Sequence, residues 1–519
     1  MLKAKRQSAR TVTVPAPIGG WNTRDPLSTM QPTDAVVIDN WFCTPTALRS
    51  RKGYTDWATG IAGNVQTIFD YDLPSGTESL FAAADNAGAC AIYDCSTKGA
   101  VGAAVVSGLT SAKFQYAHVT NSGGTFIILV NGADSLIIYN GTTWQSVTGV
   151  SAPFAITGIT TSSLSDVHLH KRRVWFIEKG SMRGWYLGVD AVAGAATQFD
   201  FGPIFTRGGH VQKIETWSLD AGYGMDDHFA VITSAGEVAI YRGIDPSTAD
   251  TWALVGVYYV GSPIGSKCTC KYGGDVLLLN KDGLIPLSKA LMSSRVSTRM
   301  VLTDKIQNRV ATDTTTYGTN FGWDVILYPP QNMLMINVPI SATQSYQYVM
   351  NTISGGWSRW TGIPAQCWYF ANETLWFGTA GKVCRAWDSG ADAGSAIITD
   401  LLPAFSAFGS VSQIKRWTMA RISMGSDNTF AYATKLSVDF DLVTIGNAPT
   451  STSPIAAGGI WDTAKWDAAT WGGDISPFAR WSYIGGMGHY GANRVRTSSN
   501  VADIRYYATD YVYEAGGVL

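Results

Sequence analysis

The sequence carries little charge for its length. Of its 519 residues, 15% are Asp, Glu, Lys or Arg, whereas globular proteins average about 25%. The formal net charge is −1, so the excess of Lys and Arg expected of a basic nucleic-acid binder is missing. Aromatic residues make up 12% of the chain, which excludes an intrinsically disordered protein. The scarcity of Glu and Lys excludes a long coiled coil.

Long hydrophobic runs are missing as well. The longest ones, such as 126–130 and 276–279, are far shorter than the roughly 20 residues that span a bilayer. The first ten residues are basic like the start of a signal peptide, but residues 11–20 contain no apolar block behind them. We therefore expect a soluble protein that is not secreted by this route and has no membrane span.

Cysteine is sparse and odd in number. The seven cysteines are spread thinly over 519 residues, and a chain of this length needs no disulfides to hold its core together. We expect reduced and mostly buried thiols, including Cys90 and Cys95.

Short apolar runs bounded by Gly, Asn and Asp recur along the chain, whereas sustained 3.6-residue amphipathicity is almost absent. This pattern predicts an all-β protein. The clearest unit is 125–144, in which Asn131-Gly132 separates two apolar runs and Asn140-Gly141 leads from the second to Trp144. Because Asn-Gly supplies the positive φ values of a tight turn, the unit is interpreted as a hairpin followed by a turn and an aromatic residue.

Seven copies of this hairpin pattern follow one another, with first strands near positions 81, 126, 175, 230, 276, 334 and 376. They lie 42 to 58 residues apart, close to the roughly 40 to 50 residues of a four-stranded propeller blade. Blades stacked around an axis bury both faces of each sheet. We predict a β-propeller of six or seven blades. An array of β-sandwiches is the alternative, because neither a WD40 nor a kelch signature is regular here.

The propeller divides the chain into three predicted regions. Residues 1–60 form an N-terminal arm that contributes to a platform and ends in a strand leading into the propeller. Residues 61–390 form the propeller. After a small-residue linker at 389–395, residues 391–519 form a further β-rich platform and interface region.

No motif indicates catalysis or a cofactor. Residues 261–267 resemble a phosphate-binding loop, but the spacing of the glycines and the lysine is wrong. Glycoside hydrolysis needs two carboxylates flanking the bond, and no motif selects a pair from the available acids. The candidates are Glu178, Asp200, Asp226, Asp227 and Asp275. We expect no catalytic residues, no cofactor and no enzyme activity.

Two residue pairs have a spacing that a metal site could use. His168 with His170, and Cys268 with Cys270, would each lie on one face of a strand, because side chains alternate with period two. A zinc site needs further ligands, and nothing in the sequence selects them. We interpret all four as packed or surface residues and expect no metal.

Tryptophan and arginine cluster near the two ends of the chain, and both are enriched at protein interfaces. Three tryptophans of the C-terminal region are five residues apart, a spacing that fits neither a strand nor a helix, so we expect a loop or irregular segment there. The candidate assembly residues are Trp21, Arg24, Trp461, Trp466, Trp471, Arg480 and Trp481.

Several segments resemble the tail nozzle family of short-tailed bacteriophages, also called tail hub or tail tubular protein B. They are Pro17-Ile-Gly-Gly-Trp-Asn-Thr-Arg-Asp-Pro-Leu27, Asp34-Ala-Val-Val-Ile-Asp-Asn-Trp-Phe42, Leu48-Arg-Ser-Arg-Lys-Gly-Tyr-Thr-Asp-Trp57, Gly355-Gly-Trp-Ser-Arg-Trp-Thr-Gly362 and Leu375-Trp-Phe-Gly-Thr-Ala-Gly-Lys-Val383. Together they bracket most of the chain.

The resemblance implies a six-fold homo-oligomeric ring below the portal and the tail adaptor protein, with a propeller in each subunit. It also implies contacts with tail fibres, a spike or a needle, and a virion tail location after synthesis in the host cytoplasm. Genomic DNA would pass through the lumen without specific binding. The scarcity of Lys and Arg suits such a conduit, because each neutralised phosphate adds salt-sensitive affinity.

Two other functions remain open from the sequence. A propeller could bind or cleave glycans at a cell surface, or it could be an intracellular scaffold for other partners. A structural tail protein is the hypothesis that the resemblance favours.

Overall fold

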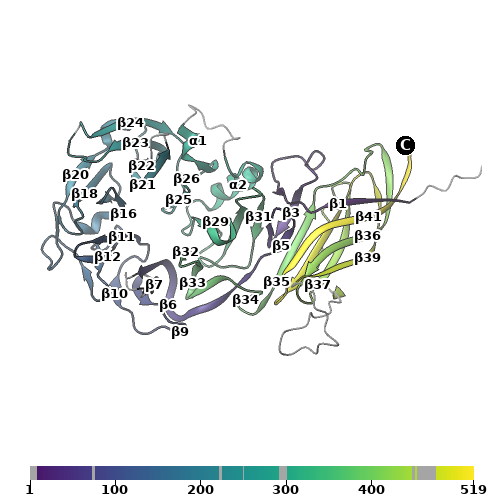
Figure 1. The fold of residues 1–519 in the computed structure, drawn as a ribbon, viewed down its shortest axis with the longest axis horizontal. Coiled ribbons are helices and arrows are strands. Elements are labelled where there is room, and N and C mark those ends of the chain that lie inside the picture. Colours follow the sequence, from purple (N-terminus) through teal and green to yellow (C-terminus); the bar gives the residue numbers. More distant parts are fainter. Residues whose placement is uncertain are drawn as a thin grey trace, which may run out of the picture.

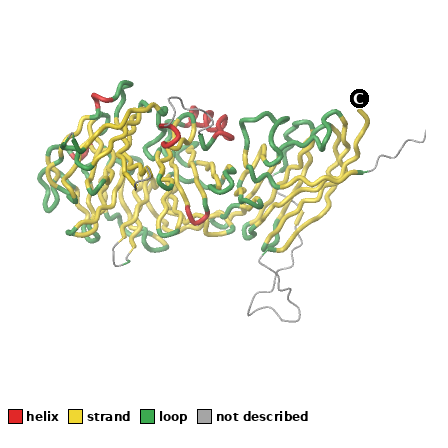
Figure 2. The backbone as a smooth tube through the Cα atoms, turned by 45° about the horizontal axis from the view of Figure 1, so that its top comes forward, coloured by secondary structure: helices red, strands yellow, loops and turns green. Residues whose placement is uncertain are grey.

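The structure is a computed structural model, and the residues it describes are 9–72, 76, 78–220, 225–248, 250–291, 301–446, 451–452 and 475–518. The chain forms two adjoining parts, a ring of small sheets and a pair of packed sheets that contains the C-terminal strands (Figure 1). Strands dominate both parts, and helices are few (Figure 2).

Seven groups of antiparallel strands surround the axis of the ring in the described part of the chain, and we number them blades 1 to 7 in chain order. Blades 2 to 5 are separate sheets, whereas blades 1, 6 and 7 belong to the large sheet that continues into the sandwich. Blade 1 contains the second half of β6 (Gly53–Asp72), whose first half belongs to blade 7. Blade 1 also contains β7 (Glu78–Asn86), β8 (Ala89–Asp94) and β10 (Val106–Leu109). Blade 2 contains β11 (Gln115–Asn121), β12 (Gly124–Val130), β13 (Ile137–Tyr139) and β14 (Trp144–Ser146). Blade 3 contains β16 (Leu164–His170), β17 (Arg173–Glu178), β18 (Arg183–Val189) and β20 (Thr197–Asp200).

The strands of blades 4 to 7 continue the same arrangement. Blade 4 contains β21 (Val211–Asp220), β22 (Met225–Thr233), β23 (Glu237–Gly243) and β24 (Trp252–Tyr259), and blade 5 contains β25 (Thr269–Tyr272), β26 (Asp275–Asn280) and β27 (Gly283–Pro286). Blade 6 contains β28 (Asp324–Tyr328), β29 (Met333–Pro339), β30 (Ser345–Asn351) and β31 (Trp357–Trp360). Blade 7 contains β32 (Cys367–Ala371) and β33 (Thr374–Ser389).

Short elements lie between the blades or between strands of one blade. They are β9 (Gly99–Ala100), β15 (Ile156–Thr157), β19 (Gly194–Ala195), α1 (Leu287–Leu291), α2 (Gln307–Tyr317) and the 3₁₀ turns Thr161–Ser163, Gly202–Ile204, Asp304–Ile306 and Pro329–Gln331. Neither of the two described α-helices offers an apolar stretch of membrane-spanning length.

Six of the seven predicted hairpins form as expected, namely β7–β8, β12–β13, β17–β18, β22–β23, β26–β27 and β29–β30. At the predicted turns, Gly132 and Gly141 have φ values of 69° and 92°. The side-chain oxygens of Asn131 and Asn140 accept hydrogen bonds from backbone N–H groups two and three residues later. The all-β propeller is confirmed, with a blade count inside the predicted range.

The seventh predicted hairpin is wrong. Residues 374–377 and 382–387 belong to one continuous strand, β33, instead of two strands that pair with each other. Its first half pairs with β32 and its second half with β6. Because β6 supplies the neighbouring strand, the chain does not need to turn back after residue 377.

Central strands of the blades are buried on both faces. In β12, Phe126 and Ile128 share an apolar cluster with blade 3, whereas Ile127 and Leu129 share one with blade 1. Equivalent clusters lie between the other neighbouring blades. This double burial explains why the central strands are continuous apolar runs, which a strand with one solvated face would not be.

The ring is closed by β6, which pairs with β33 on the last blade and with β7 on the first. Gly60 and Gly63, with φ values of 77° and 95°, lie where the strand passes from one blade to the other. A Cβ atom at Gly63 would lie 2.2 Å from the carbonyl oxygen of Asp85. Only glycine therefore fits at this crossing.

Strands from both ends of the chain build a β-sandwich beside the propeller. Its outer sheet contains β1 (Arg10–Pro15), β4 (Trp41–Cys43), β5 (Leu48–Ser50), β36 (Gln413–Ser426), β39 (Ser476–Gly488) and β41 (Ile504–Val518). Its inner sheet contains β3 (Asp34–Asp39), β35 (Ser395–Pro403), β37 (Ala431–Val438), β38 (Ser451–Thr452) and β40 (Gly491–Ser499). The short strands β2 (Gly20–Trp21) and β34 (Ala391–Asp392) adjoin it. The predicted regions 1–60 and 391–519 thus share one core.

The sandwich core is rich in aromatic rings. Trp417 and Tyr511 of the outer sheet pack with Leu436 of the inner sheet, and Tyr506 packs with Tyr432 in the cluster that also reaches the propeller. All seven cysteines are free, and six of them are buried, as the sequence predicts.

Backbone pairing joins the sandwich to blade 6. Gly20 in β2 pairs with Trp357 in β31, and a Cβ at Gly20 would lie 2.4 Å from the Trp357 backbone nitrogen. The Arg359 guanidinium forms two hydrogen bonds with Asp39, at 2.8 and 2.6 Å. The two parts are therefore in contact through close backbone packing and a bidentate ion pair.

A buried arginine ties three segments together at this junction. The side chain of Arg51 is 1% exposed. Its Nε donates to Asn40 Oδ1 at 2.9 Å, one terminal nitrogen to Asp392 Oδ1 at 2.7 Å, and the other to the Thr361 carbonyl at 2.7 Å. The contacts reach the N-terminal region, the segment after blade 7 and the last strand of blade 6.

Replacing this arginine should weaken the whole junction. Arg51→Met leaves the mostly buried carboxylate of Asp392 without its partner, so the free energy of unfolding should fall by about 3 to 5 kcal/mol. Urea unfolding followed by tryptophan fluorescence measures the loss. The matched control is Arg416→Met, whose side chain is 68% exposed and should change stability by less than about 0.5 kcal/mol. Equal effects of the two substitutions would contradict the assignment.

Candidate functional site

A cavity of about 520 Å³ lies between the innermost strands of the blades. Its lining comes from β11, β16, β21, β25, β28 and β32. Polar side chains, including Gln115, His168, Lys213, Glu215 and Thr269, share this lining with apolar ones such as Ile326, Leu327 and Trp368. The axial cavity is therefore mixed in character, whereas the clusters between the blades are apolar.

Polar contacts join the inner strands of the blades around the axis, and Lys213 of blade 4 receives the contacts from both blade 2 and blade 3. The pairs are Tyr369 with Asp70, His118 with Asp70, Gln115 with Lys213, Asp166 with Lys213, Glu215 with Thr269, Lys267 with Asp324, and Asp324 with the Trp368 backbone N–H. In this order, the pairs link blade 7 to blade 1, blade 1 to blade 2, blade 2 to blade 4, blade 3 to blade 4, blade 4 to blade 5, blade 5 to blade 6, and blade 6 to blade 7. We call this ring of contacts the axial belt.

The cationic groups of the belt are paired with carboxylates. Lys213 Nζ lies 2.8 Å from Asp166 Oδ1, and Lys267 Nζ lies 3.4 Å from Asp324 Oδ2. Burial opposes the charge of Lys213, but the nearby carboxylates of Asp166 and Glu215 outweigh it and raise the pKa of that ammonium. Two of the three lysines that line the axial cavity, Lys213 and Lys267, thus face a carboxylate.

The two candidate metal-binding histidines do share one side of β16. His168 Nε2 and His170 Nδ1 each lie 2.9 Å from the hydroxyl of Thr216. Burial lowers the pKa of both imidazoles to about 3. No group of three metal-ligating side chains occurs among the residues the structure describes.

The two cysteines are packed residues, as expected, but they do not share one face of a strand. Cys268 packs in the cluster between blades 4 and 5, whereas Cys270 packs against the cluster that includes blade 6. The reason is that β25 begins at Thr269, so the period-two alternation of a strand does not extend back to Cys268.

The candidate acids hydrogen-bond separately, each to its own neighbours. Glu178 binds Arg183 and the Trp185 indole, and Asp275 binds the Trp217 indole and Ser288. Asp200 caps the turn at Gly202, and Asp227 accepts a hydrogen bond from Ser218. The side chain of Asp226 lies outside the described residues.

His118 differs from the other two inner histidines in its protonation. Burial opposes its charge, but its hydrogen bonds to Asp70 outweigh burial and raise its pKa above the usual 6.5. Its link between blades 1 and 2 should therefore be at full strength below pH 6.5 and weaken as the pH rises through the raised pKa. The lowered pKa values of His168 and His170 have the opposite effect on stability. The contribution of these two histidines to folding stability is complete above pH 6.5 and falls as the pH drops from 6.5 toward 3.

NMR titration of the imidazole protons tests these assignments. The resonance of His118 should titrate above pH 6.5, and those of His168 and His170 should stay constant between pH 8 and pH 5. His118→Gln should remove only the high-pH titration. Titration of His168 near 6.5 would contradict its burial against Thr216.

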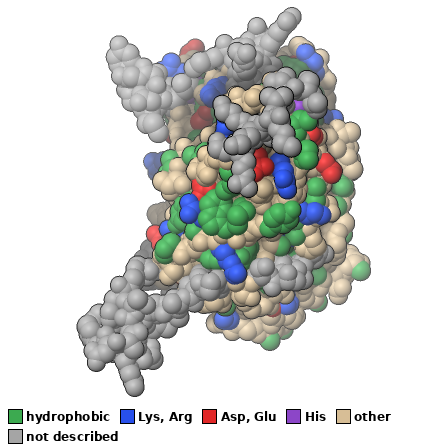
Figure 3. Space-filling view, turned by 90° about the vertical axis from the view of Figure 1, so that its right-hand side faces the viewer, with side chains coloured by type: hydrophobic (Ala, Val, Ile, Leu, Met, Phe, Trp, Pro, Cys, Tyr) green, Lys and Arg blue, Asp and Glu red, His purple; other side chains and the backbone are tan. Residues whose placement is uncertain are grey.

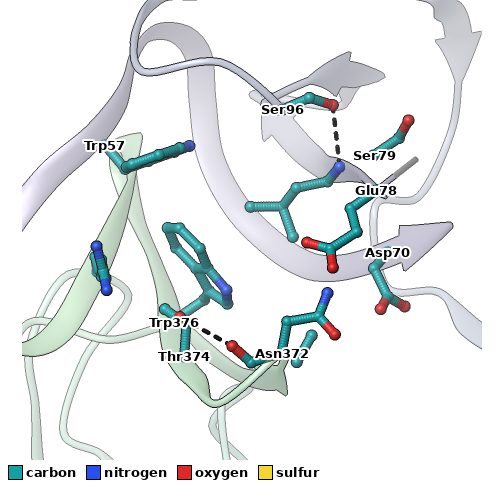
Figure 4. Close-up of a pocket in the computed structure, with 11 residues that line it drawn as sticks. Trp57, Asp70, Glu78, Ser79, Ser96, Asn372, Thr374 and Trp376 are labelled. Atoms are coloured by element: carbon teal, nitrogen blue, oxygen red, sulfur yellow. Dashed lines mark hydrogen bonds between the residues drawn. The ribbon is translucent and has the colours of Figure 1, made fainter. Parts of the chain in front are cut away.

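A second pocket, of about 340 Å³, lies where blade 7 meets blade 1 (Figure 4). Trp57 and Trp376 meet there edge to face, with ring centroids 5.1 Å apart. Asp70, Glu78 and Asn372 also line the pocket. It combines two indoles with carboxylate and amide groups.

Of the two N-terminal assembly candidates, the structure buries one. Trp21 is 7% exposed, its indole N–H donates to the Val36 carbonyl at 3.0 Å, and its ring contacts Tyr348. This side chain packs in the core, because β2 pairs with both β3 and β31. Arg24 is 41% exposed and pairs with Asp25 and Asp304.

The C-terminal candidates Arg480 and Trp481 lie on β39 and are exposed. Trp481 pairs in register with Arg421 of β36, whose guanidinium lies over the indole, 5.1 Å from the ring centroid. Asp510 accepts a hydrogen bond from Arg421 Nε at 2.8 Å. Trp461, Trp466 and Trp471, and the irregular segment predicted around them, lie outside the described residues.

Around Trp481 the outer sheet exposes further large apolar side chains. We define the β39 face as Met419, Trp481, Tyr483, Met487 and Tyr507, with exposed fractions of 39%, 37%, 81%, 66% and 37%. Hydrophobic side chains gather in the middle of the sandwich end of the molecule, with Lys and Arg among them (Figure 3).

Sequence reasoning did not select Tyr483 and Met487. The available signal is the strand alternation from Trp481 onward, which places every second residue on one face. The strand gives no indication by itself that this face points to solvent.

No family model matches the chain, and no curated protein matches it. Among solved structures, it is similar to BBS1N crystallised with ARL6DN, at 11% identity and a TM-score of 0.38, over 64% of this chain and 96% of that one. The β-propeller domain of Cps50 (Swd1) from Myceliophteria thermophila matches at 10% identity and a TM-score of 0.38, over 64% and 98%. Puromycin hydrolase matches at 13% identity and 0.34, over 68% and 55%. At these values the similarities carry no argument about function, and the propeller rests on the blades described above.

Proposed function

We propose that this β-propeller protein is a structural subunit of the tail of a short-tailed bacteriophage. In this proposal it forms a ring-shaped nozzle below the portal and adaptor, and the genome leaves through the ring during infection. Tail fibres, a spike or a needle attach around or below it.

The observation that carries the proposal is the spatial convergence of the segments that resemble the nozzle family. Residues 17–27 and 355–362 lie at opposite parts of the sequence, yet Gly20 pairs with Trp357. Residues 34–42 meet the same late segment through Asp39 and Arg359. Residues 48–57 and 375–383 meet through the ring contacts of Tyr54 with Phe377 and of Trp57 with Trp376. The segments that resemble the nozzle family therefore lie together in one contiguous unit. Chance resemblances scattered along the sequence would have no reason to meet in space.

The β39 face supports an assembling role. Monomeric proteins rarely leave large contiguous apolar areas exposed, and such areas mark interaction sites. Aromatic residues, methionine and arginine are enriched at protein interfaces, and all three types occur here in Trp481, Met487 and Arg421.

Charge is also compatible with a DNA conduit. The whole chain has a formal net charge of −1, so few phosphates would be neutralised as DNA passes. The charge of the lumen itself depends on how subunits are arranged in the ring and stays a prediction.

The test is whether the protein assembles into rings with the portal–adaptor complex of the virus. The full-length protein, alone and mixed with the portal–adaptor complex of the same virus, should form closed rings in negative-stain electron microscopy, with a matching mass in light scattering. A protein that remains monomeric and never associates with that complex would contradict the proposal.

Glycan binding is a second candidate, favoured by the pocket between blades 7 and 1. Aromatic rings and a few convergent polar groups are typical of ligand sites, and Trp57, Trp376 and Glu78 supply both kinds.

Fluorescence titration with host surface polysaccharides tests this candidate. Trp376→Ala should weaken binding about tenfold or more, equivalent to roughly 1.4 kcal/mol, whereas Trp481→Ala on the β39 face should bind normally. Lack of binding by the unmodified protein across a glycan array would eliminate the candidate.

A further inference from the structure

The pocket between blades 7 and 1 has an aromatic side. Trp57 of β6 and Trp376 of β33 have ring planes 69° apart, so their indoles form a corner of this cavity of about 340 Å³. The Trp57 N–H donates to the Cys95 carbonyl at 2.9 Å, which fixes the orientation of this ring. The face of an aromatic ring carries negative partial charge and attracts cations, and tryptophan attracts them most strongly. The corner therefore suits a ligand that carries a positive charge.

The other side of the pocket is acidic. Asp70, Glu78 and Asn372 line it, and Figure 4 shows these three side chains on the side opposite Trp57. Beside them, Asp72 of β6 pairs in register with Glu78 of β7. Like charges directly opposite each other on two strands repel. Burial raises the pKa of the Asp72 carboxyl, and the nearby carboxylates of Asp70 and Glu78 raise it further.

The cations near the pocket have partners other than Glu78. His118 Nε2 lies 3.1 Å from Asp70 Oδ1. Arg385, which also lines the pocket, has its Nε 3.5 Å from Asp388. In the part of the chain that the structure describes, no Lys, Arg or His forms an ion pair with Glu78. A positively charged ligand group beside Glu78 would therefore reduce its repulsion with Asp72.

Neutral polar groups complete the lining. Ser79, Ser96, Asn372 and Thr374 contribute to it, and in Figure 4 the indole nitrogen of Trp376 lies toward Asn372. An amide both donates and accepts hydrogen bonds, and an indole N–H donates one. These groups match the hydroxyls of a sugar, whose ring can lie against an indole.

We propose that this pocket binds a sugar that carries a free amino group, with the ammonium beside Glu78 and the sugar ring against Trp376. The inference rests on the glycan candidate for this pocket and names its class of sugar. Such a ligand would contact Trp376 and Asn372 of blade 7 and Glu78 of blade 1. It would therefore bridge the two blades between which β6 closes the ring.

Calorimetric titration of the full-length protein with glucosamine, glucose and propylamine tests the charge and the sugar separately. At about pH 6, well below the pKa of an amine, glucosamine should bind at least about fivefold more tightly than glucose, the scale of one cation–π contact or partly exposed ion pair. It should also bind more tightly than propylamine, which has no hydroxyls for Asn372. Bound glucosamine should raise the temperature of unfolding, because a ligand of the folded chain stabilises it.

The variant Glu78→Gln locates the charge. It should weaken glucosamine binding about fivefold and leave glucose binding unchanged, because only the charged ligand loses an attraction. Glu78 is exposed, and the substitution removes its repulsion with Asp72, so the unliganded variant should unfold at no lower temperature than the wild type. The matched control is Glu373→Gln, an exposed carboxylate next to Asn372 that is not part of the pocket lining. This control should bind glucosamine as the wild type does.

The outcomes separate this inference from the functions proposed above. Equal affinity for glucose and glucosamine, or an equal effect of Glu78→Gln on both, would overturn the inference and leave the glycan candidate standing. Propylamine that binds as tightly as glucosamine would overturn it as well, because the sugar would then contribute nothing. A protein that binds no sugar, here or on the glycan array, would eliminate the glycan candidate together with this inference. The nozzle proposal is tested separately, by ring assembly.

Discussion

The structure depends on one strand that belongs to two blades. β6 pairs with β33 through its first half and with β7 through its second, so the ring stays closed only while this strand holds both neighbours. Its start follows Arg51 and β5 of the sandwich, and Asp70 near its end accepts hydrogen bonds from Tyr369 and His118. Ring closure, attachment of the sandwich and part of the axial belt therefore rest on one segment of twenty residues.

Two kinds of contact hold neighbouring blades together. Apolar clusters fill the wedge between neighbouring blades, where strands such as β12 are buried on both faces. At the axis, around the cavity of about 520 Å³, paired polar groups such as Lys213 with Asp166 add to these apolar contacts. Removing one partner of a buried ion pair leaves an uncompensated charge and costs free energy. Moving one blade away from its neighbours would therefore break contacts of the axial belt and destabilise the ring.

The junction gives the proposed assembly a defined geometry. Close packing of Gly20 on Trp357, the Arg359–Asp39 pair and the Arg51 contacts place the sandwich against blade 6. Head-to-tail repetition yields closed rings only if the two docking surfaces of each subunit keep a constant relation. In the proposed ring, the relation between propeller and sandwich is determined by this junction.

The sequence alone determined what depends on near neighbours in the chain. Alternation and continuous apolar runs predicted the six hairpins that form, Asn-Gly placed the turns at Gly132 and Gly141, and cysteine number predicted free thiols. Only the tertiary structure decided what depends on distant pairing. It decided that β33 is one strand because β6 lies beside it, that Trp21 is buried because β2 lies between β3 and β31, and that Trp481 is exposed because its side chain lies on the outer face of the outer sheet. Exposure of a side chain is set by the segments that cover it, and in this chain those segments come from hundreds of residues away.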